Sequence, residues 1–446
     1  MTFWRTLKMS KSLHFIGIKG TGMASLAKIM LNLGYSVQGS DIPRHFFTED
    51  SLRELQVPIL PFDAHNIKDN MTVIVGNAFG DDHEEVVAAR QNPSVKVYRY
   101  HEFLGHIMKD YRSISVSGSH GKTTTTTLLR DMLEASHNTG YLIGDGRGEL
   151  HTNDSYFAVE ACEFRRHFLA YYPKVAIMTN FEIDHVDYFK SVEDYLSAYE
   201  EFANNVEELL IVWGDDPHYG DLKFTKPVWT YGLSDRNKVQ AMNIERTKTH
   251  SIFDVNVDGK FIKRFNLPLV GDHMILDALA VIAVGIYEGI ALDSIESGLQ
   301  NFKGAKRRYV IEEGQENVYI DDYAHHPTEI KVTLEATRVR YPDKKIVAIF
   351  KPHRVGRVYY FVDEFASALS IADKVFLCPF TSIDDQEEGI DIDITYLQDR
   401  IPNSDIIDNM DSDIDKLEQE GPAVFVFMSS KDIYDLKDAL KTRYND

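Results

Sequence analysis

Two glycine-rich segments constrain the fold of this chain most strongly, because each joins a short apolar strand to a helix. In the first, Leu13–Ile18 leads into Gly17–Gly22, and helical spacing follows over Met23–Leu33. In the second, Ser113–Ser117 leads into Gly118–Thr123 (GSHGKT), and another helix follows. A turn of this kind brings backbone N–H groups and the positive end of a helix dipole close to a phosphate. The pattern predicts an α/β protein with ligand-binding turns.

Short apolar strands continue to alternate with helical segments along the chain. The further strands that we expect are Ser36–Gly39, Met71–Val75, Val95–Tyr98, Tyr156–Glu160, Val175–Thr179, Val318–Ile320, Ile346–Phe350, Lys374–Leu377 and Ala423–Phe427. Such alternation implies parallel sheets covered by helices. The 446 residues are about three times a typical domain of roughly 150 residues, which fits three such series with boundaries near residues 110 and 309.

Two local patterns add detail to the second series. Ile252–Val257 and Phe261–Phe265 flank Asp258-Gly259, whose residues tolerate positive φ, so we expect a hairpin there. His273–Tyr287 is strongly apolar and predicts a buried helix. At the N-terminus, the folded pattern begins only at about Leu13, which makes Met9 a candidate natural start.

Composition excludes several classes of protein. Lysine and arginine number 48 and aspartate and glutamate 69, so the formal net charge is −21. This balance argues against general nucleic-acid binding, which needs cations to neutralise phosphates. The two cysteines, Cys162 and Cys378, make neither a disulfide framework nor a metal-ligand pattern, which favours a reducing, cytoplasmic compartment. No apolar run approaches the ~18–20 residues of a membrane span.

The second glycine-rich segment carries the chemistry of a nucleotide site. Glycines at 118 and 121 let backbone N–H groups approach a phosphate, Lys122 can reach the β- and γ-phosphates, and the hydroxyl of Thr123 can ligate magnesium. The spacing is two residues shorter than the standard Walker A loop. A glycine turn before an ordinary helix is the alternative, and the flanking strand and helix favour the nucleotide site.

The first glycine-rich segment is a permuted relative of the dinucleotide fingerprint. Asp41 follows the second strand, where an acid often meets a ribose. A tight turn between strand and helix explains the glycines equally well. This segment alone would suggest a nicotinamide oxidoreductase. The second glycine-rich segment, Gly118–Thr123, argues against that function, and we call it the phosphate loop.

Acidic and imidazole side chains follow the strands of the second series. Glu160 ends one strand, Glu163 is near it, and His185 comes after the next strand. The carboxyl ends of strands converge on the ligand crevice, so Glu160 and His185 are predicted to face Lys122 and hold magnesium. Magnesium prefers oxygen ligands, so His185 could equally be an ordinary hydrogen-bonding histidine.

The third series begins with a cluster of charged residues. Tyr319–Pro327 contains two aspartates and two histidines, but adjacent side chains diverge and no cysteine accompanies them. A loop that handles substrate and nucleotide is therefore favoured over zinc. Arg307 and Arg308 are either an exposed basic linker or a clamp on phosphate, for which the guanidinium fork is suited.

Together these motifs resemble the Mur ligases of peptidoglycan synthesis. The segments that carry the resemblance are, in order, HFIGIKGTGM, SGSHGKTTTT, VEACEFRRHF, TNFEIDHVDYF, KRR, DDYAHHPTE and FKPHR, which extend over about Leu13–Asp432. The resemblance implies an ATP-dependent amide ligase with ATP and Mg²⁺ as cofactors. The implied substrates are UDP-N-acetylmuramate and L-alanine, joined through an acyl phosphate.

The resemblance also implies an α/β fold of three domains. Residues 1–110 would form a Rossmann-like N-terminal domain that binds the UDP-sugar. Residues 111–309 would form a central P-loop ATPase-like domain, and residues 310–446 a C-terminal Rossmann-like domain that binds ATP and the amino acid.

Site residues carry over position by position. The implied catalytic residues are Lys122, Glu160 and His185, and the implied magnesium ligands are Thr123, Glu160 and His185. The implied ATP-binding residues are Gly118, Ser119, His120, Gly121, Lys122, Thr123, Thr124, Asp277, Arg308 and Asp322. The implied UDP-sugar residues are Gly20, Thr21, Gly22, Met23, Ser40, Asp41 and His101. The implied amino-acid residues are Tyr323, His325, Arg354 and Arg357.

The chain departs from the family pattern in three places. Asp277 and Met274 replace asparagines that contact adenine, and a carboxylate can accept a hydrogen bond but cannot donate as an amide does. Ser429–Lys431 replaces a turn with two glycines, which removes backbone freedom. Lys351 stands where the family has glutamine. A ligase for another amino acid or a peptide, and a weakly catalytic paralogue that binds UDP-sugars, are the two alternatives within this family.

Overall fold

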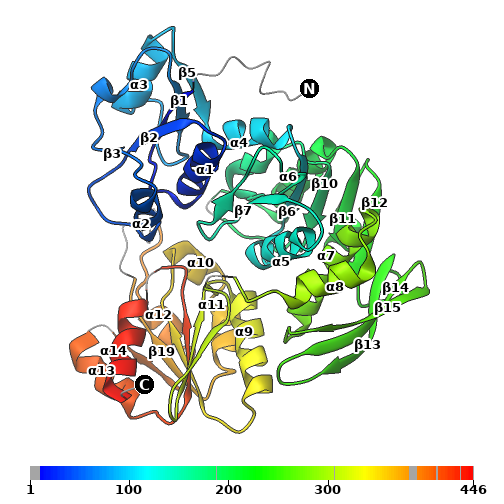
Figure 1. Cartoon of the computed structure of the whole chain (residues 1–446). Helices are drawn as coiled ribbons and strands as arrows, with labels where there is room; N and C mark the ends of the chain where they lie inside the picture. Colours follow the sequence, from blue (N-terminus) through cyan, green and yellow to red (C-terminus); the bar gives the residue numbers. More distant parts are fainter. Residues whose placement is uncertain are drawn as a thin grey trace.

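The computed structural model describes residues 11–186, 188–305, 307–380, 389–407, 410–431 and 433–444. In them the chain forms three α/β units, each built around its own sheet (Figure 1). The expected α/β fold in three parts is therefore confirmed. The candidate start at Met9 lies outside the described residues.

The N-terminal unit contains a five-stranded parallel sheet in the order β3-β2-β1-β4-β5. Its strands are β1 (Ser12–Ile16), β2 (Ser36–Ser40), β3 (Ile59–Leu60), β4 (Thr72–Val75) and β5 (Lys96–Arg99). Its helices are α1 (Thr21–Asn32), α2 (Phe47–Glu54), η2 (Ala64–Asn66), α3 (Glu84–Gln91) and α4 (Tyr100–Met108). The chain progresses in opposite directions on either side of β1, so the crevice at the ends of β1 and β4 is a topological switch point, where such sheets bind ligands.

The central unit has a ten-stranded sheet in the order β15-β14-β13-β12-β11-β10-β6-β9-β7-β8. Its strands are β6 (Arg112–Ser117), β7 (Thr139–Leu142), β8 (Gly148–Glu149), β9 (Tyr156–Glu160), β10 (Val175–Met178), β11 (Leu209–Trp213), β12 (Val228–Gly232), β13 (Val239–Arg246), β14 (Ser251–Val257) and β15 (Lys260–Leu267). Its helices are α5 (Lys122–Glu134), η3 (Phe164–Ala170), α6 (Val192–Asn205), η4 (Tyr219–Asp221), α7 (Asp272–Tyr287) and α8 (Leu292–Gln300). The predicted hairpin is confirmed, and Asp258 and Gly259 have φ of 49° and 73° at its turn.

The C-terminal unit has a six-stranded sheet in the order β16-β17-β21-β18-β19-β20, with only β16 antiparallel to its neighbour. Its strands are β16 (Val310–Glu313), β17 (Val318–Asp322), β18 (Ile346–Phe350), β19 (Lys374–Leu377), β20 (Ser404–Ile406) and β21 (Val424–Met428). Its helices are α9 (Pro327–Arg340), α10 (Val355–Tyr360), α11 (Val362–Leu369), α12 (Thr395–Gln398), α13 (Met410–Glu418) and α14 (Tyr434–Tyr444).

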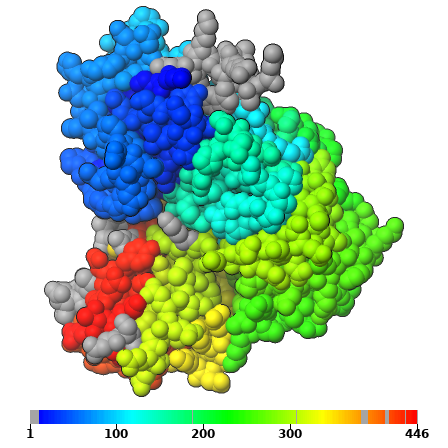
Figure 2. Space-filling model, viewed as in Figure 1, coloured from blue at the N-terminus to red at the C-terminus, as the bar shows by residue number. Residues whose placement is uncertain are grey.

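The units are joined in two different ways. Leu26 and Phe103 of the N-terminal unit share one buried apolar cluster with Phe157 and Phe202 of the central unit. The C-terminal unit shares no such cluster with the other units among the described residues. It has two apolar clusters of its own, one on each face of its sheet, because alternate residues of its strands point to opposite faces. In the space-filling view both outer units border the central one (Figure 2). Among the described helices, none has the length and apolar character needed to cross a membrane.

Candidate active site

The loop between β6 and α5 requires its two glycines. Gly118 and Gly121 have φ of +132° and +80°, conformations that L side chains rarely adopt. A Cβ at Gly118 would collide with Thr179 after β10, and a Cβ at Gly121 would lie 2.8 Å from Oδ1 of Asp277 on α7. The loop is therefore held tightly between the end of the sheet and α7, with α5 beginning at its end.

Lys122 lies in a nearly buried cluster with a carboxylate and a histidine. Its Nζ is 3.0 Å from Oε2 of Glu163 and donates to the carbonyl of Ser119 at 3.0 Å. On its other side, Oε1 of Glu163 is 3.6 Å from Nε2 of His185. Burial lowers the pKa of Lys122, but the negative groups around it, with Glu163 the strongest, together outweigh burial and raise that pKa above its usual value. The lysine therefore stays charged at the loop.

Two oxygen groups meet beside this cluster. The hydroxyl of Thr123 donates to Oε2 of Glu160 at 3.0 Å, and the same oxygen accepts from the backbone N–H of Gly144 at 2.8 Å. A hydroxyl beside a carboxylate fits a hard, oxygen-seeking cation such as Mg²⁺. His185 contacts Glu163 in this structure, so it is linked to the oxygen pair only through the cluster around Lys122.

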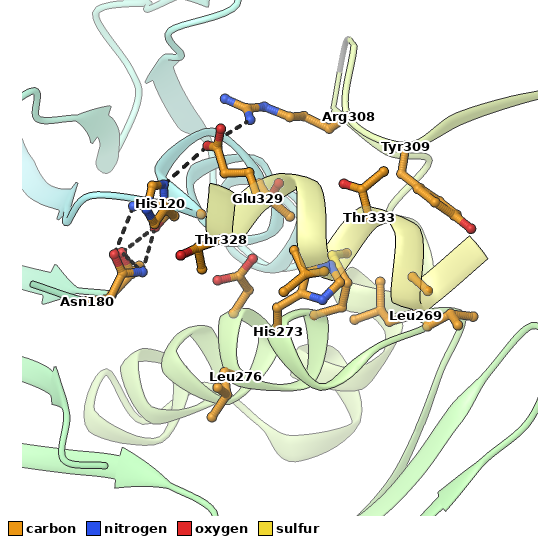
Figure 3. Close-up of a pocket in the computed structure, with 18 of the residues that line it drawn as sticks. His120, Asn180, Leu269, His273, Leu276, Arg308, Tyr309, Thr328, Glu329 and Thr333 are labelled. Carbon is orange, nitrogen blue, oxygen red and sulfur yellow. Dashed lines mark hydrogen bonds and ion pairs between the residues drawn. The ribbon is translucent and has the colours of Figure 1, made fainter. Parts of the chain in front are cut away.

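A cavity of about 760 Å³ opens beside the loop, between α7 and α9 (Figure 3). The predicted ATP-binding residues that line it are His120, Gly121, Thr124, Asp277, Arg308 and Asp322. Trp213, His273 and Tyr309, which the sequence did not single out, line it as well. Small-molecule sites usually measure ~300–1,000 Å³, so the cavity has the size of a nucleotide site.

Asp277 is buried in the wall of this cavity. Burial raises its pKa to about 7, although the nearby hydroxyl of Thr125 and the charge of Arg308 partly oppose the shift. Near neutral pH a large share of this carboxyl therefore carries a proton. A protonated carboxyl both donates and accepts, as an amide does. The difference from asparagine that the sequence predicted is thus largely removed below about pH 7.

Asp322, at the end of β17, binds the backbone of the segment that enters the C-terminal unit at Tyr309. Its Oδ2 accepts from the backbone N–H of Tyr309 at 2.8 Å and its Oδ1 from that of Ala324 at 2.7 Å. Burial raises the pKa of Asp322 to about 6 despite the nearby charge of Arg308. Both carboxylate oxygens thus have a backbone partner, and Asp322 is one of the residues that line the cavity.

The linker arginine Arg308 points inward rather than into solvent. Its guanidinium lies 4.7 Å over the ring of Tyr323, and its NH1 is 3.7 Å from Oε1 of Glu329. Nδ1 of His325 lies 2.9 Å from the other oxygen of Glu329. This arrangement favours the phosphate-clamp interpretation over an exposed basic linker. It also makes Glu329 the anchor of this side of the cavity.

The Ser429–Lys431 turn, which lacks the family's glycines, is held by hydrogen bonds that do not need them. Arg307 donates to the carbonyls of Ser429 and Lys431, each at 2.7 Å. The hydroxyl of Ser429 donates to the carbonyl of Lys351 at 2.9 Å and accepts from the N–H of Lys431 at 3.0 Å. Ser429, Ser430 and Lys431 all have negative φ. The conformation of this turn therefore does not need the backbone freedom that the glycines would provide. Asp432, the last residue of the motif, lies outside the described residues.

The predicted amino-acid residues lie where the C-terminal unit meets the central one. NH2 of Arg357 donates to Oδ1 of Asp184 at 2.8 Å, and both side chains are nearly buried. The guanidinium of Arg354 lies 5.5 Å over the ring of Phe164, which packs 4.6 Å from the ring of His185. The C-terminal arginines are thereby brought beside the cluster around Lys122.

In the N-terminal unit, two predicted UDP-sugar residues bind their own chain. Asp41 accepts from the backbone N–H groups of Lys19 and Ile42, each at 2.8 Å. Ser40 is fully buried, and its hydroxyl donates to Glu85. Asp41 therefore shapes the loop after β1, and the side chain of Ser40 does not face the crevice in this structure.

The remaining predicted UDP-sugar residues surround the start of α1 and the boundary with the central unit. Gly22 allows α1 to approach α4, because a Cβ there would lie 2.7 Å from Oη of Tyr100. His101 stacks on His167 of the central unit with ring centroids 4.5 Å apart, and its Nδ1 is 3.1 Å from Oδ1 of Asn77. Gly20, Thr21 and Met23 lie at the cap and first turn of α1.

Three family models match consecutive parts of the chain. They are the catalytic domain of the Mur ligase family over residues 12–112, the Mur ligase middle domain over 116–285, and the glutamate ligase domain of Mur ligases over 306–431. The chain belongs to the Mur ligase family. Mur ligases are ATP-dependent ligases of peptidoglycan precursors, and this Mur ligase carries all three of their parts.

Solved structures resemble this Mur ligase over different shares of its length. The UDP-N-acetylmuramate–alanine ligase of Thermotoga maritima is 27% identical, with 97% of this chain and 99% of that chain covered and a TM-score of 0.80. The UDP-N-acetylmuramate:L-alanyl-γ-D-glutamyl-meso-diaminopimelate ligase of Neisseria meningitidis is 28% identical, with 66% and 99% covered and a TM-score of 0.59. The murein peptide ligase of Psychrobacter arcticus, at 24% identity, shares the fold over 97% and 98% with a TM-score of 0.71.

Three carboxylates of this Mur ligase received no role from the sequence, although all three stand in segments that carry the family resemblance. Glu163 links Lys122 to His185, Glu329 links His325 to Arg308, and Asp184 pairs with Arg357. Glu163 had a signal, since two acids stand at the end of one strand. Glu329 and Asp184 lie within quoted motifs, but their partners Arg308 and Arg357 belong to other segments, so the sequence did not indicate these contacts.

Proposed function

We propose that this Mur ligase joins L-alanine to the lactyl carboxylate of UDP-N-acetylmuramate, with ATP as energy source and Mg²⁺ as its metal. The main support is its likeness to an alanine-adding ligase along nearly the full length of both chains. Further support comes from the charged Lys122 and the Thr123–Glu160 oxygen pair beside a cavity of nucleotide size.

The reaction proceeds in two displacements. An oxygen of the lactyl carboxylate attacks the γ-phosphorus of ATP, and ADP leaves as an acyl phosphate forms. The free amine of alanine then attacks the acyl carbon, a tetrahedral intermediate forms, and its collapse expels phosphate and leaves the amide. No enzyme nucleophile is needed, so catalysis consists of positioning and charge stabilisation.

Each step assigns a role to residues of this chain. Lys122 neutralises charge on the transferred phosphoryl group, and the N–H groups of the Gly118–Thr123 loop bind the phosphates. Thr123 and Glu160 would hold magnesium, which supplies further positive charge at those phosphates. Arg354 and Arg357 would bind the carboxylate of alanine, for which the guanidinium fork is suited.

The three substrates are assigned to three domains. We assign residues 1–110 to the UDP-sugar, residues 111–309 to ATP, and residues 310–446 to ATP and the amino acid. Tyr323 and His325 complete the amino-acid side in this proposal. Because the ligands would come from different domains, closure must bring them together before each displacement.

A second candidate is a ligase that attaches a peptide to the muramyl nucleotide. It is favoured by the 28% identity to the tripeptide-adding ligase of N. meningitidis, although that match covers only 66% of this chain. The two candidates differ in the size of the amine that the site accepts.

A panel of amines distinguishes the candidates. The purified chain is given ATP, Mg²⁺, UDP-N-acetylmuramate and either L-alanine, glycine, L-serine or L-alanyl-γ-D-glutamyl-meso-diaminopimelate, and ADP release is followed. We expect L-alanine to give the highest kcat/KM. Preference for the tripeptide would establish the second candidate, and no turnover with any amine would reject both.

A further inference from the structure

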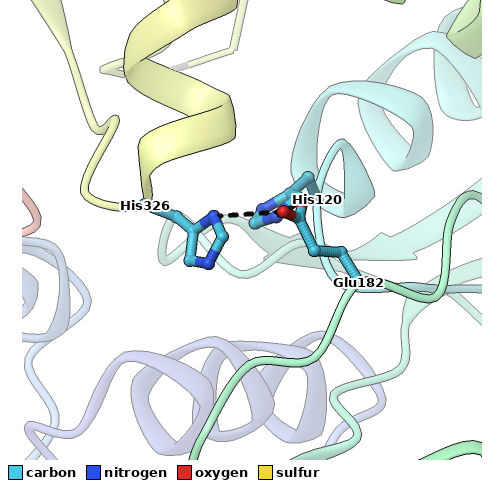
Figure 4. Close-up of side chains that lie close together, drawn as sticks. All are labelled: His120, Glu182 and His326. Atoms are coloured by element: carbon cyan, nitrogen blue, oxygen red, sulfur yellow. Dashed lines mark hydrogen bonds and ion pairs between the residues drawn. The ribbon is translucent and has the colours of Figure 1, made fainter. Parts of the chain in front are cut away.

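A second group of potential metal ligands lies apart from the Thr123–Glu160 pair. His120 from the phosphate loop, Glu182 from the segment after β10, and His326 at the start of α9 form what we call the bridging cluster (Figure 4). One ligand atom from each lies within 4.8 Å of the other two. Two residues come from the central unit and one from the C-terminal unit, so the cluster crosses their boundary.

His326 is the unusual member of the bridging cluster. It is 1% exposed, and within the described part of the chain neither of its ring nitrogens has a hydrogen-bond partner. Its Nδ1 faces Oε1 of Glu182 across 4.0 Å, which is too long for a hydrogen bond. Buried polar groups normally have partners, and leaving one without costs free energy. A ligand between the side chains would satisfy this ring.

The other two members are already oriented for such a ligand. Nε2 of His120 is 3.0 Å from Oε2 of Glu182, while its Nδ1 is 3.3 Å from Oε1 of Glu329. Thr328 donates to Oε1 of Glu182 at 2.7 Å. Metal-binding histidines typically direct their second ring nitrogen to a carboxylate, and metal-binding carboxylates are themselves hydrogen-bonded. Glu329 and Thr328 supply both of these supporting contacts.

We propose that the bridging cluster binds one zinc-class transition-metal ion through His120, Glu182 and His326. Two imidazoles and one carboxylate form a donor set that zinc, cobalt and nickel prefer, whereas Mg²⁺ seeks oxygen. The remaining position is open to water or to an oxygen of a ligand in the adjoining cavity, which His120 and Glu182 also line. The ion ties α9 to the phosphate loop, so it stabilises the association of the C-terminal unit with the central one.

Zinc binding to the full-length, metal-stripped chain tests the proposal directly, without nucleotide or magnesium. Calorimetry should show a zinc site whose affinity falls more than about 100-fold in His326→Gln and in Glu182→Gln, because even outer-shell changes cost 10–100-fold. His65→Gln is the matched control, since His65 also faces a carboxylate but is 93% exposed. It should bind zinc as the wild type does. Far-UV circular dichroism verifies that each variant is folded.

Cobalt separates this site from another group of possible ligands, Cys162, Glu163 and His185. Co²⁺ in the bridging cluster should show visible d–d bands without a thiolate charge-transfer band, and Cys162→Ser should leave those bands unchanged. The bands should persist in excess Mg²⁺. The proposal is overturned if zinc binds the two cluster variants as tightly as the wild type, or if Cys162→Ser abolishes the cobalt bands.

Discussion

At the scale of single residues, the chemistry of the site depends on charges held out of water. Lys122 and Glu163 are opposite charges in a nearly dry place, and the negative charges around Lys122 keep its ammonium group charged. Asp277 has no such partner at close range, so burial shifts its carboxyl toward the neutral form. Similar burial therefore yields a permanent cation at the phosphate loop and a titrating acid in the cavity wall.

Lys122→Ala should abolish acyl-phosphate formation, because it removes the cation that we propose neutralises the transferred phosphoryl group. We expect ADP release to fall by about 100- to 1,000-fold or more, the usual effect of losing one such group. UDP-sugar binding, measured by calorimetry, should be spared, which also shows that the variant folds. Lys260→Ala, at the exposed start of β15, is the control. Retained activity of Lys122→Ala would remove this lysine from the mechanism.

ATP affinity should depend on the protonation of Asp277. Its pKa is raised from 3.8 to about 7, so its ability to donate a hydrogen bond is present at low pH and is lost as pH rises through about 7. The same sign holds for folding: the stabilisation from this proton is complete below about pH 4 and disappears by about pH 8. We expect ATP to bind up to about tenfold more weakly at pH 8 than at pH 6.

Asp277→Asn is the matched control for that pH dependence, because an amide donates at every pH. ATP itself titrates in this range, but equally for both proteins. The ratio of the two dissociation constants should therefore change with pH. A ratio that stays constant from about pH 6 to about pH 8 would mean that the proton on Asp277 does not contribute to ATP binding.

At the scale of elements, loops that connect strands to helices determine where side chains meet. The phosphate loop needs positive φ at both glycines, and sequence reasoning identified it because that need is local. The Ser429–Lys431 turn is instead determined by contacts with distant residues. Its shape depends on Arg307, more than a hundred residues away, and on the hydroxyl of Ser429. No local pattern could have predicted that serine would suit this turn.

Restoring the family's glycine should therefore destabilise this turn. Ser429→Gly loses the hydrogen bonds to Lys351 and Lys431 and gains backbone freedom in the unfolded chain. We expect a loss of about 1–2 kcal/mol in the free energy of unfolding, measured by urea denaturation. Ser94→Gly, in an exposed turn of the N-terminal unit, should cost less. A more stable Ser429→Gly would contradict this account of the turn.

At the scale of the whole molecule, the sequence indicates much of the order of strands and helices. It does not indicate which distant segments contact one another. Alternating strands and helices, and the hairpin at Asp258-Gly259, follow from short stretches of sequence. Eight strands were not foreseen, and most of them are short; they are β3, β7, β8, β11, β12, β13, β16 and β20. The ion pair between Arg357 and Asp184 joins positions 173 residues apart, and charged side chains of this kind usually indicate solvent-exposed surface.

That ion pair should hold the C-terminal unit against the central one. Asp184→Ala leaves the guanidinium of Arg357 buried without its carboxylate, at a cost of about 3–5 kcal/mol. We expect a larger radius of gyration in solution scattering without ligands. Asp184→Leu combined with Arg357→Met should restore compactness, because it removes both buried charges. Asp293→Ala, which breaks a pair whose carboxylate is 93% exposed, should change nothing. Equal dimensions for all four proteins would contradict the role of the pair.

We propose above all that the chain activates a lactyl carboxylate as an acyl phosphate and transfers the acyl group to L-alanine. The most direct measurement uses UDP-N-acetylmuramate labelled with ¹⁸O in that carboxylate, together with ATP, Mg²⁺ and L-alanine. Mass spectrometry of the products should find one ¹⁸O atom in the released phosphate and one in the new amide. Unlabelled phosphate, or release of phosphate without an amide product, would contradict the claim.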